Sequence, residues 1–117
     1  RFDDRSQAHE ALQLVLAAVV RRLDAGEAKD LIAQLPSLLH EDLRRVPEAV
    51  DRSVTRETVV AELTQRLGMD EPTASTALLA VGGAVAELVS DGQMNDVRGQ
   101  LPPGLREAFE LPQPLET

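Results

Sequence analysis

The sequence contains no cysteine, tryptophan or tyrosine, and only two of its 117 residues are phenylalanines. The lack of cysteine excludes disulfides, thiolate nucleophiles and metal sites with cysteine ligands. The scarcity of aromatic side chains argues against strands and for a core of Leu, Val and Ala, which favour helices. No segment shows the period-two alternation or the turn signals of a hairpin, so we predict no sheet.

Long apolar runs are also missing. The longest, residues 14–20, is far shorter than the ~20 residues that span a bilayer. Residues 1–5 contain no apolar run and do not resemble a signal peptide. We therefore expect a cytoplasmic protein that has no membrane partner. The net charge of −8 repels phosphate backbones, and few aromatic side chains can stack on bases, so we also expect no nucleic-acid binding.

The strongest pattern that is present is an internal repeat. When the chain is shifted by 66 residues, residues 8–43 align with 74–109 without a gap, and 13 of the 36 pairs are identical. Self-similarity at a fixed period indicates a duplicated structural unit. We interpret 1–117 as a single domain, which the 43% apolar content is sufficient to fold. Its parts are repeat one (8–43), a linker (44–54), repeat two (55–109) and a tail (110–117).

Both repeats predict the same series of helices. Apolar residues at helical spacing indicate a long helix over 6–23 and another over 71–89. A capping box should then open a short helix in each repeat, with Asp24 and Glu27 in the first and Ser90 and Gln93 in the second.

The proline breaks and a helix that opens repeat two complete the prediction. Pro36 and Pro102 should end the short helices and suit the first turn of a further one. At the start of repeat two, Thr55 is a plausible N-cap and Gly68 a C-terminal glycine for another helix. The two prolines of the tail should end the fold there.

This pattern of long helix, short capped helix, Gln-Leu-Pro break and Leu-Leu helix resembles domain-of-unknown-function family 2267 of bacteria. The resemblance is closer still over Arg56–Phe109. It implies an all-α, compact bundle of about seven helices, built from two pseudo-symmetric repeats. Each unit of the family opens with an amphipathic helix that ends near Leu-Gly. Val59–Gly68 matches that helix in repeat two, and repeat one has no counterpart, as expected if the helix was lost or the chain is a fragment. The resemblance implies no activity.

Two kinds of polar residue are candidates for chemistry. His9 and His40 lie beside acids, but neither has the spacing of a metal-ligand pair, so we interpret them as surface histidines. The pairs Asp30/Asp96 and Gln34/Gln100 recur in both repeats, and could line a shared groove. We favour a structural role, in which the glutamines satisfy backbone groups at the proline breaks and the aspartates pair with arginines. We expect no metal and no cofactor.

Gly82 and Gly83 lie inside the second long helix, where they cost about 2 kcal/mol relative to alanine. With Ala86 they share one flank of that helix, and the matching flank of the first long helix carries Leu16 and Val20. We predict that these five residues form a close-contact or interface surface. A groove for a ligand or partner is the alternative.

No catalytic constellation or cofactor motif is present. We therefore expect a non-enzymatic helical interaction module that binds an unknown protein partner or forms a homo-oligomer. A small-ligand or metal-binding regulatory domain, with its site between the repeats near Gly82, is the alternative. An enzyme would need carboxylates such as Glu41 and Glu107 to converge. We interpret the basic pairs 21–22 and 44–45 as solvated helix ends rather than phosphate ligands.

Overall fold

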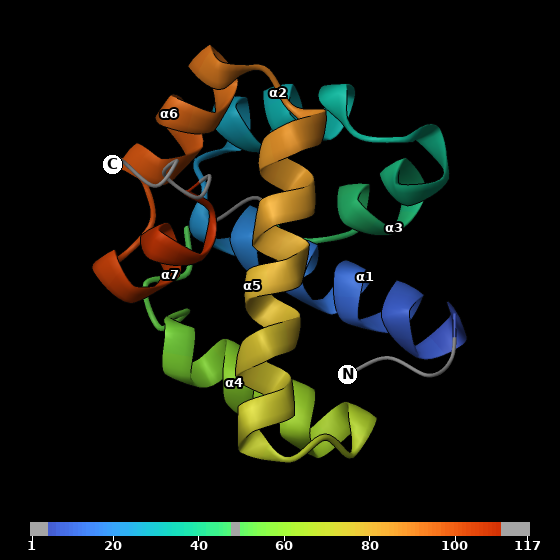
Figure 1. Cartoon of the computed structure of the whole chain (residues 1–117). Coiled ribbons are helices and arrows are strands. Elements are labelled where there is room, and N and C mark those ends of the chain that lie inside the picture. The colour runs from blue at the N-terminus through green and yellow to red at the C-terminus, as the bar shows by residue number, and fades with distance from the viewer. Residues whose placement is uncertain (1–4, 48–49, 111–117) are drawn as a thin grey trace, which may run out of the picture.

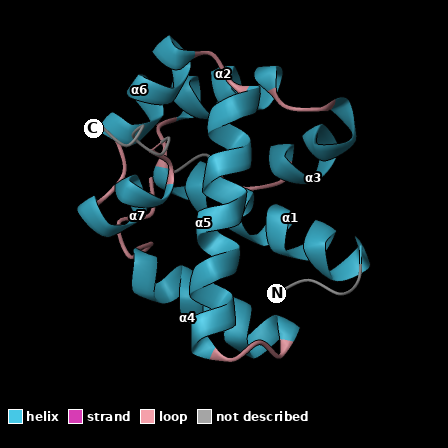
Figure 2. Cartoon of the chain, viewed as in Figure 1, coloured by secondary structure: helices cyan, strands magenta, loops and turns pink. Residues whose placement is uncertain are grey.

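The computed structural model describes residues 5–47 and 50–110, which form only helices and the loops that join them (Figures 1 and 2). The predicted all-α fold is therefore confirmed. Apart from Glu110, the predicted tail lies outside the described residues. The helices are α1 (Arg5–Arg22), α2 (Ala25–Gln34), the 3-10 turn η1 (Ser37–Leu39), α3 (His40–Arg44), α4 (Arg56–Leu67), α5 (Glu71–Leu88), α6 (Asp91–Gly99) and α7 (Pro103–Ala108).

Two long helices organise the bundle. Helix α5 packs against α1, and α4 packs against both of them (Figure 1). At one end of the molecule α2 packs against α6, while α3 lies on α1 and α7 lies on α5. The core is built mainly from Leu, Val and Ala, with Phe109 as its largest fully buried side chain. No polar or charged residue is buried within the described ranges, and none of the helices there could cross a membrane.

The helix bounds follow the 66-residue shift. Helices α1 and α5 start at Arg5 and Glu71, and they end at Arg22 and Leu88. Helices α2 and α6 also start 66 residues apart, and a break follows at the Leu-Pro pair of each repeat. These bounds agree with a duplicated unit, while the superposition of the two repeats stays a prediction.

Local capping explains where most helices begin. The side chains of Asp24 and Ser90 accept hydrogen bonds from the backbone N–H three residues ahead, at 2.8 and 3.2 Å. The predicted capping boxes are only half formed, because neither Glu27 nor Gln93 reaches back to the N-cap backbone. Thr55 does form a complete box, with Thr58. After α4, Gly68 has a φ of 68°, a left-handed conformation that favours glycine.

Candidate functional site

The two repeats exchange hydrogen bonds where α2 meets α6. The side chain of Gln100, at the end of α6, accepts from the Asp24 backbone N–H at 2.9 Å and donates to Asp24 Oδ2 at 2.9 Å. In the opposite direction, the side chain of Gln34, at the end of α2, accepts from the Ser90 backbone N–H at 2.8 Å. In a complete capping box, Glu27 or Gln93 would accept from the N-cap backbone N–H. Here a glutamine of the other repeat accepts from that N–H instead.

Glu27 and Gln93 meet between these two contacts, where Gln93 Nε2 donates to a Glu27 carboxylate oxygen. Partial burial raises the pKa of Glu27, and the charges of Asp96, Asp30 and Asp24 raise it further, against the opposing hydrogen bond. Asp30 and Asp96 were expected to pair with arginines, but both are exposed and form no ion pair in the described part of the chain. Within the same residues, no three acidic or histidine side chains are grouped to hold a metal ion.

At the proline breaks, the backbone carbonyl groups accept hydrogen bonds from residues other than the predicted glutamines. His40 Nε2 donates to the carbonyl oxygen of Leu35 at 2.7 Å, immediately before the first proline. At the equivalent position of repeat two, Arg106 donates to the carbonyl oxygen of Leu101 at 3.3 Å. A histidine and an arginine thus do the same work in the two repeats. His40 is half-buried and bound to the backbone, whereas His9 is exposed as predicted.

The basic pairs are partly used within the fold. Arg21 forms an ion pair with Glu62 of α4 at 3.4 Å, and Arg22 donates to the carbonyl oxygen of Gln100 at 3.4 Å. Both arginines are half-buried. Arg45 is exposed and pairs with two carboxylates of α3, those of Glu41 and Asp42. Three of the four arginines are thus already engaged in contacts within the chain.

Of the glycines in the chain, Gly82 is the one that lies closest to another helix, which is α7. A Cβ atom at Gly82 would lie 1.8 Å from the carbonyl oxygen of Ala108, and its next neighbours would be the Ala108 carbonyl carbon and the Phe109 nitrogen. A Cβ at Gly83 would meet nothing within 4 Å, so Gly83 takes no part in this contact. The backbone of α7, rather than Leu16 and Val20 of α1, supplies the atoms nearest to Gly82.

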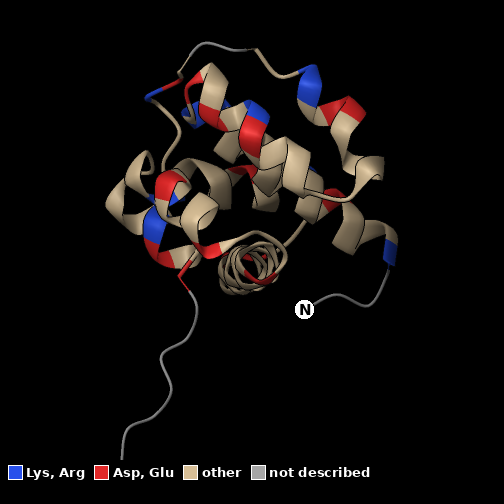
Figure 3. Ribbon diagram, turned by 90° about the horizontal axis from the view of Figure 1, so that it is seen from above, with Lys and Arg blue, Asp and Glu red and all other residues tan. Residues whose placement is uncertain are grey.

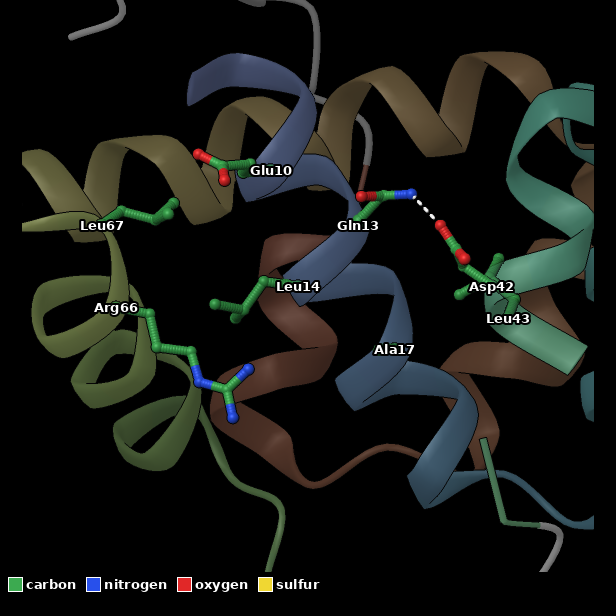
Figure 4. A pocket seen from close by; sticks show the side chains of 8 residues that line it. All are labelled: Glu10, Gln13, Leu14, Ala17, Asp42, Leu43, Arg66 and Leu67. Atoms are coloured by element: carbon green, nitrogen blue, oxygen red, sulfur yellow. Dashed lines mark hydrogen bonds between the residues drawn. The ribbon is translucent and has the colours of Figure 1, made fainter. Parts of the chain in front are cut away.

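A groove of about 350 Å³ lies elsewhere, between α1, α3 and α4 (Figure 4). Leu14, Leu43 and Leu67 form part of its wall, and a hydrogen bond from Gln13 to Asp42 crosses one side. Because this groove lies away from Gly82, it does not match the ligand site that was expected there.

The outer face of α5 is exposed and mostly apolar, and its one charged residue is the exposed Glu87 near the C-terminal end of the helix. From Pro72 to Ala86 the helix carries no charged side chain. Leu79 and Leu88 are 49% and 55% exposed. Between them lie Ala80, Gly83 and Ala84, of which the two alanines are exposed. Figure 3 looks along α5, which lies at one edge of the molecule. We call this surface the α5 face; it consists of Leu79, Ala80, Gly83, Ala84 and Leu88.

A family model described as "Uncharacterized conserved protein (DUF2267)" matches residues 1–108. The chain belongs to the DUF2267 family. No curated protein matches the sequence. The resemblance found in the motifs is thereby confirmed.

In this DUF2267 domain, the predicted surface is divided between two places. Gly82 and Ala86 are buried in α5, as Leu16 and Val20 are buried in α1, while Gly83 lies on the α5 face. The sequence interpretation missed Leu79 and Leu88. The signal that could have found them is the uncharged run of α5, because a helix that is apolar on all sides is normally covered on all sides.

Proposed function

We propose that this DUF2267 domain is a non-enzymatic interaction module, and that it binds a partner protein through the α5 face. The exposure of Leu79 and Leu88, on a helix that carries no charged side chain from Pro72 to Ala86, carries the proposal. Exposed apolar surface of this kind marks interaction sites in soluble proteins. Figure 3 shows charged residues spread over the other α-helices, whereas α5 has none from Pro72 to Ala86, which distinguishes the α5 face from its surroundings.

The side chains of the α5 face suit a helical or extended partner. Ala80, Gly83 and Ala84 are small and allow another backbone to approach closely. Leu79 and Leu88 flank them and offer apolar area that a partner would bury. In repeat one the positions of these leucines hold Gln13 and Arg22, so an apolar side chain is not required there for the repeat to fold.

The double variant Leu79→Gln/Leu88→Arg tests the proposal, because it installs the residues that repeat one already tolerates. A photo-crosslinking amino acid at Ala84 should give a discrete adduct in the cells that express the protein, and the double variant should lose that adduct. The same amino acid at Leu38, which is 69% exposed but lies in η1, is the matched control and should give none. An absent adduct at Ala84, or one that the double variant retains, would contradict the proposal.

A further inference from the structure

Helix α4 covers one face of α1, and its contacts define how it lies there. Gln7 Nε2 donates to the carbonyl oxygen of Leu67 at 3.0 Å, and Arg21 pairs with Glu62 at 3.4 Å. Ala18 lies between Gln7 and Arg21 on the same face of α1. It is 11 residues, or about three turns, after Gln7 and three residues before Arg21. Ala18 has no exposed surface.

The equivalent face of α5 has no such cover. A shift of 66 residues takes Ala18 to Ala84, and Ala84 is exposed. The side chain is the same in the two repeats, so the difference in exposure comes from the neighbouring element. Helix α4 packs on this face of α1 through the contacts of Gln7 and Arg21, whereas Ala84 stays exposed among the described residues.

We infer that the α5 face binds an amphipathic helix of the α4 type, carried by a partner protein, in the geometry that α4 adopts on α1. The inference rests on the proposed function and names its partner. Such a helix has apolar residues three and four positions apart, as Val60, Leu63 and Leu67 are in α4. The small residues of the α5 face leave room for its backbone.

Charge specifies the partner helix further. The α5 residue equivalent to Arg21 is Glu87, which is exposed. Where α4 presents Glu62 to an arginine, the partner must therefore present a cation to a glutamate. The net charge of −8 also attracts a cationic helix at long range and disfavours a second copy of this acidic chain.

A peptide of residues 55–69 provides the probe, because it retains the Thr55 capping box. An isolated helix of this length is marginal in water, so a side-chain cross-link should join positions 61 and 65, both of them exposed in α4. Two labelled versions are titrated into the full chain and followed by fluorescence anisotropy, one with Glu62 and one with Glu62→Arg.

We expect the Glu62→Arg peptide to bind about twofold to fivefold more tightly than the Glu62 peptide, the range of an exposed ion pair. The protein variant Glu87→Arg should invert that preference. Glu57→Arg changes the net charge equally but lies in α4, so it should leave the preference unchanged. Leu79→Gln/Leu88→Arg should weaken both peptides.

Two results would overturn the inference: no binding of either peptide, or a preference that Glu87→Arg does not invert. If the crosslink at Ala84 persists while neither peptide binds, the α5 face is still an interaction site and only the partner is wrong. Sedimentation of the parent then shows whether that partner is a second copy of the chain.

Discussion

Gln34 and Gln100 perform the same task in opposite directions. Gln34 accepts from the first backbone N–H of the α6 cap at 2.8 Å, and Gln100 accepts from that of the α2 cap at 2.9 Å. The N-termini of α2 and α6 therefore each depend on the repeat to which they do not belong. This exchange gives the identical Gln-Leu-Pro motifs a structural reason that is independent of any ligand.

The first prediction concerns these glutamines. Gln34→Ala and Gln100→Ala should each lower the free energy of unfolding by about 1 kcal/mol, because each removes the acceptor for a helix-terminal N–H. Urea denaturation measures the change. Gln65→Ala is the matched control, since Gln65 is exposed on α4, and it should stay within about 0.5 kcal/mol of the parent. Equal stability of all three variants would show that water replaces the glutamines at no cost.

The second prediction concerns Glu27, whose pKa is raised above the ordinary value of 4.5. In the pH range between the two values the folded state binds more protons than the unfolded state, so stability falls as the pH rises through it. Above that range the full cost of the charged carboxylate is present. Glu27→Gln should therefore raise the free energy of unfolding at pH 7. Thermal melts at several pH values should show this gain shrinking as the pH falls towards 4.5.

Gln93→Glu is the matched opposite of that change. It places a second carboxylate against Glu27, so the variant should be less stable than the parent at pH 7 and should recover on acidification. If Glu27→Gln and Gln93→Glu shift stability in the same direction at pH 7, repulsion at this position is not the cause.

The helix bounds were predictable from the sequence because their causes are local. Asp24, Ser90 and Thr55 cap helices whose starts lie within three residues of them, and Gly68 ends α4. The contacts between repeats were not predictable, because Gln100 binds Asp24 across 76 residues of chain. A local motif such as a capping box does not reveal that a distant side chain completes it.

The hydrogen bonds at the proline breaks could not be predicted, for a different reason. His40 and Arg106 are chemically unlike, so comparing the repeats does not reveal that each donates to the carbonyl oxygen of the residue before the proline. The contact between Gly82 and α7 was not predicted either. Helical spacing shows which flank the glycine lies on, but not which neighbouring element reaches that flank.

The third prediction is that the protein does not bind nucleic acid at about 150 mM salt, where only short-range contacts remain unscreened. It follows from the net charge of −8 and from the engagement of Arg21, Arg22 and Arg45 within the chain. Gel shifts with DNA and RNA measure it, and a basic protein of similar size serves as the positive control. A retained, salt-sensitive complex would contradict the prediction.

The last prediction compares Gly82 with Gly83, which are adjacent in α5 but differ in surroundings. A Cβ at Gly82 would overlap the Ala108 carbonyl oxygen, and backbone cannot move aside as a flexible side chain can. Gly82→Ala should therefore destabilise the fold, although alanine is worth about 1 kcal/mol more than glycine within a helix. Overpacking of this kind costs about 1–3 kcal/mol, and Gly82→Leu should cost more than Gly82→Ala.

Gly83→Ala is the control, since a Cβ there has open space and only the gain in helix propensity remains. It should raise the free energy of unfolding by up to about 1 kcal/mol in the same urea titrations. In repeat one, Leu16 stands at the position of Gly82. Its side chain fills the space through which α7 approaches α5 in repeat two, so α3 cannot approach the backbone of α1 as closely. If Gly82→Ala is as stable as Gly83→Ala, α7 does not rest on Gly82, and the asymmetry between the repeats must have another cause.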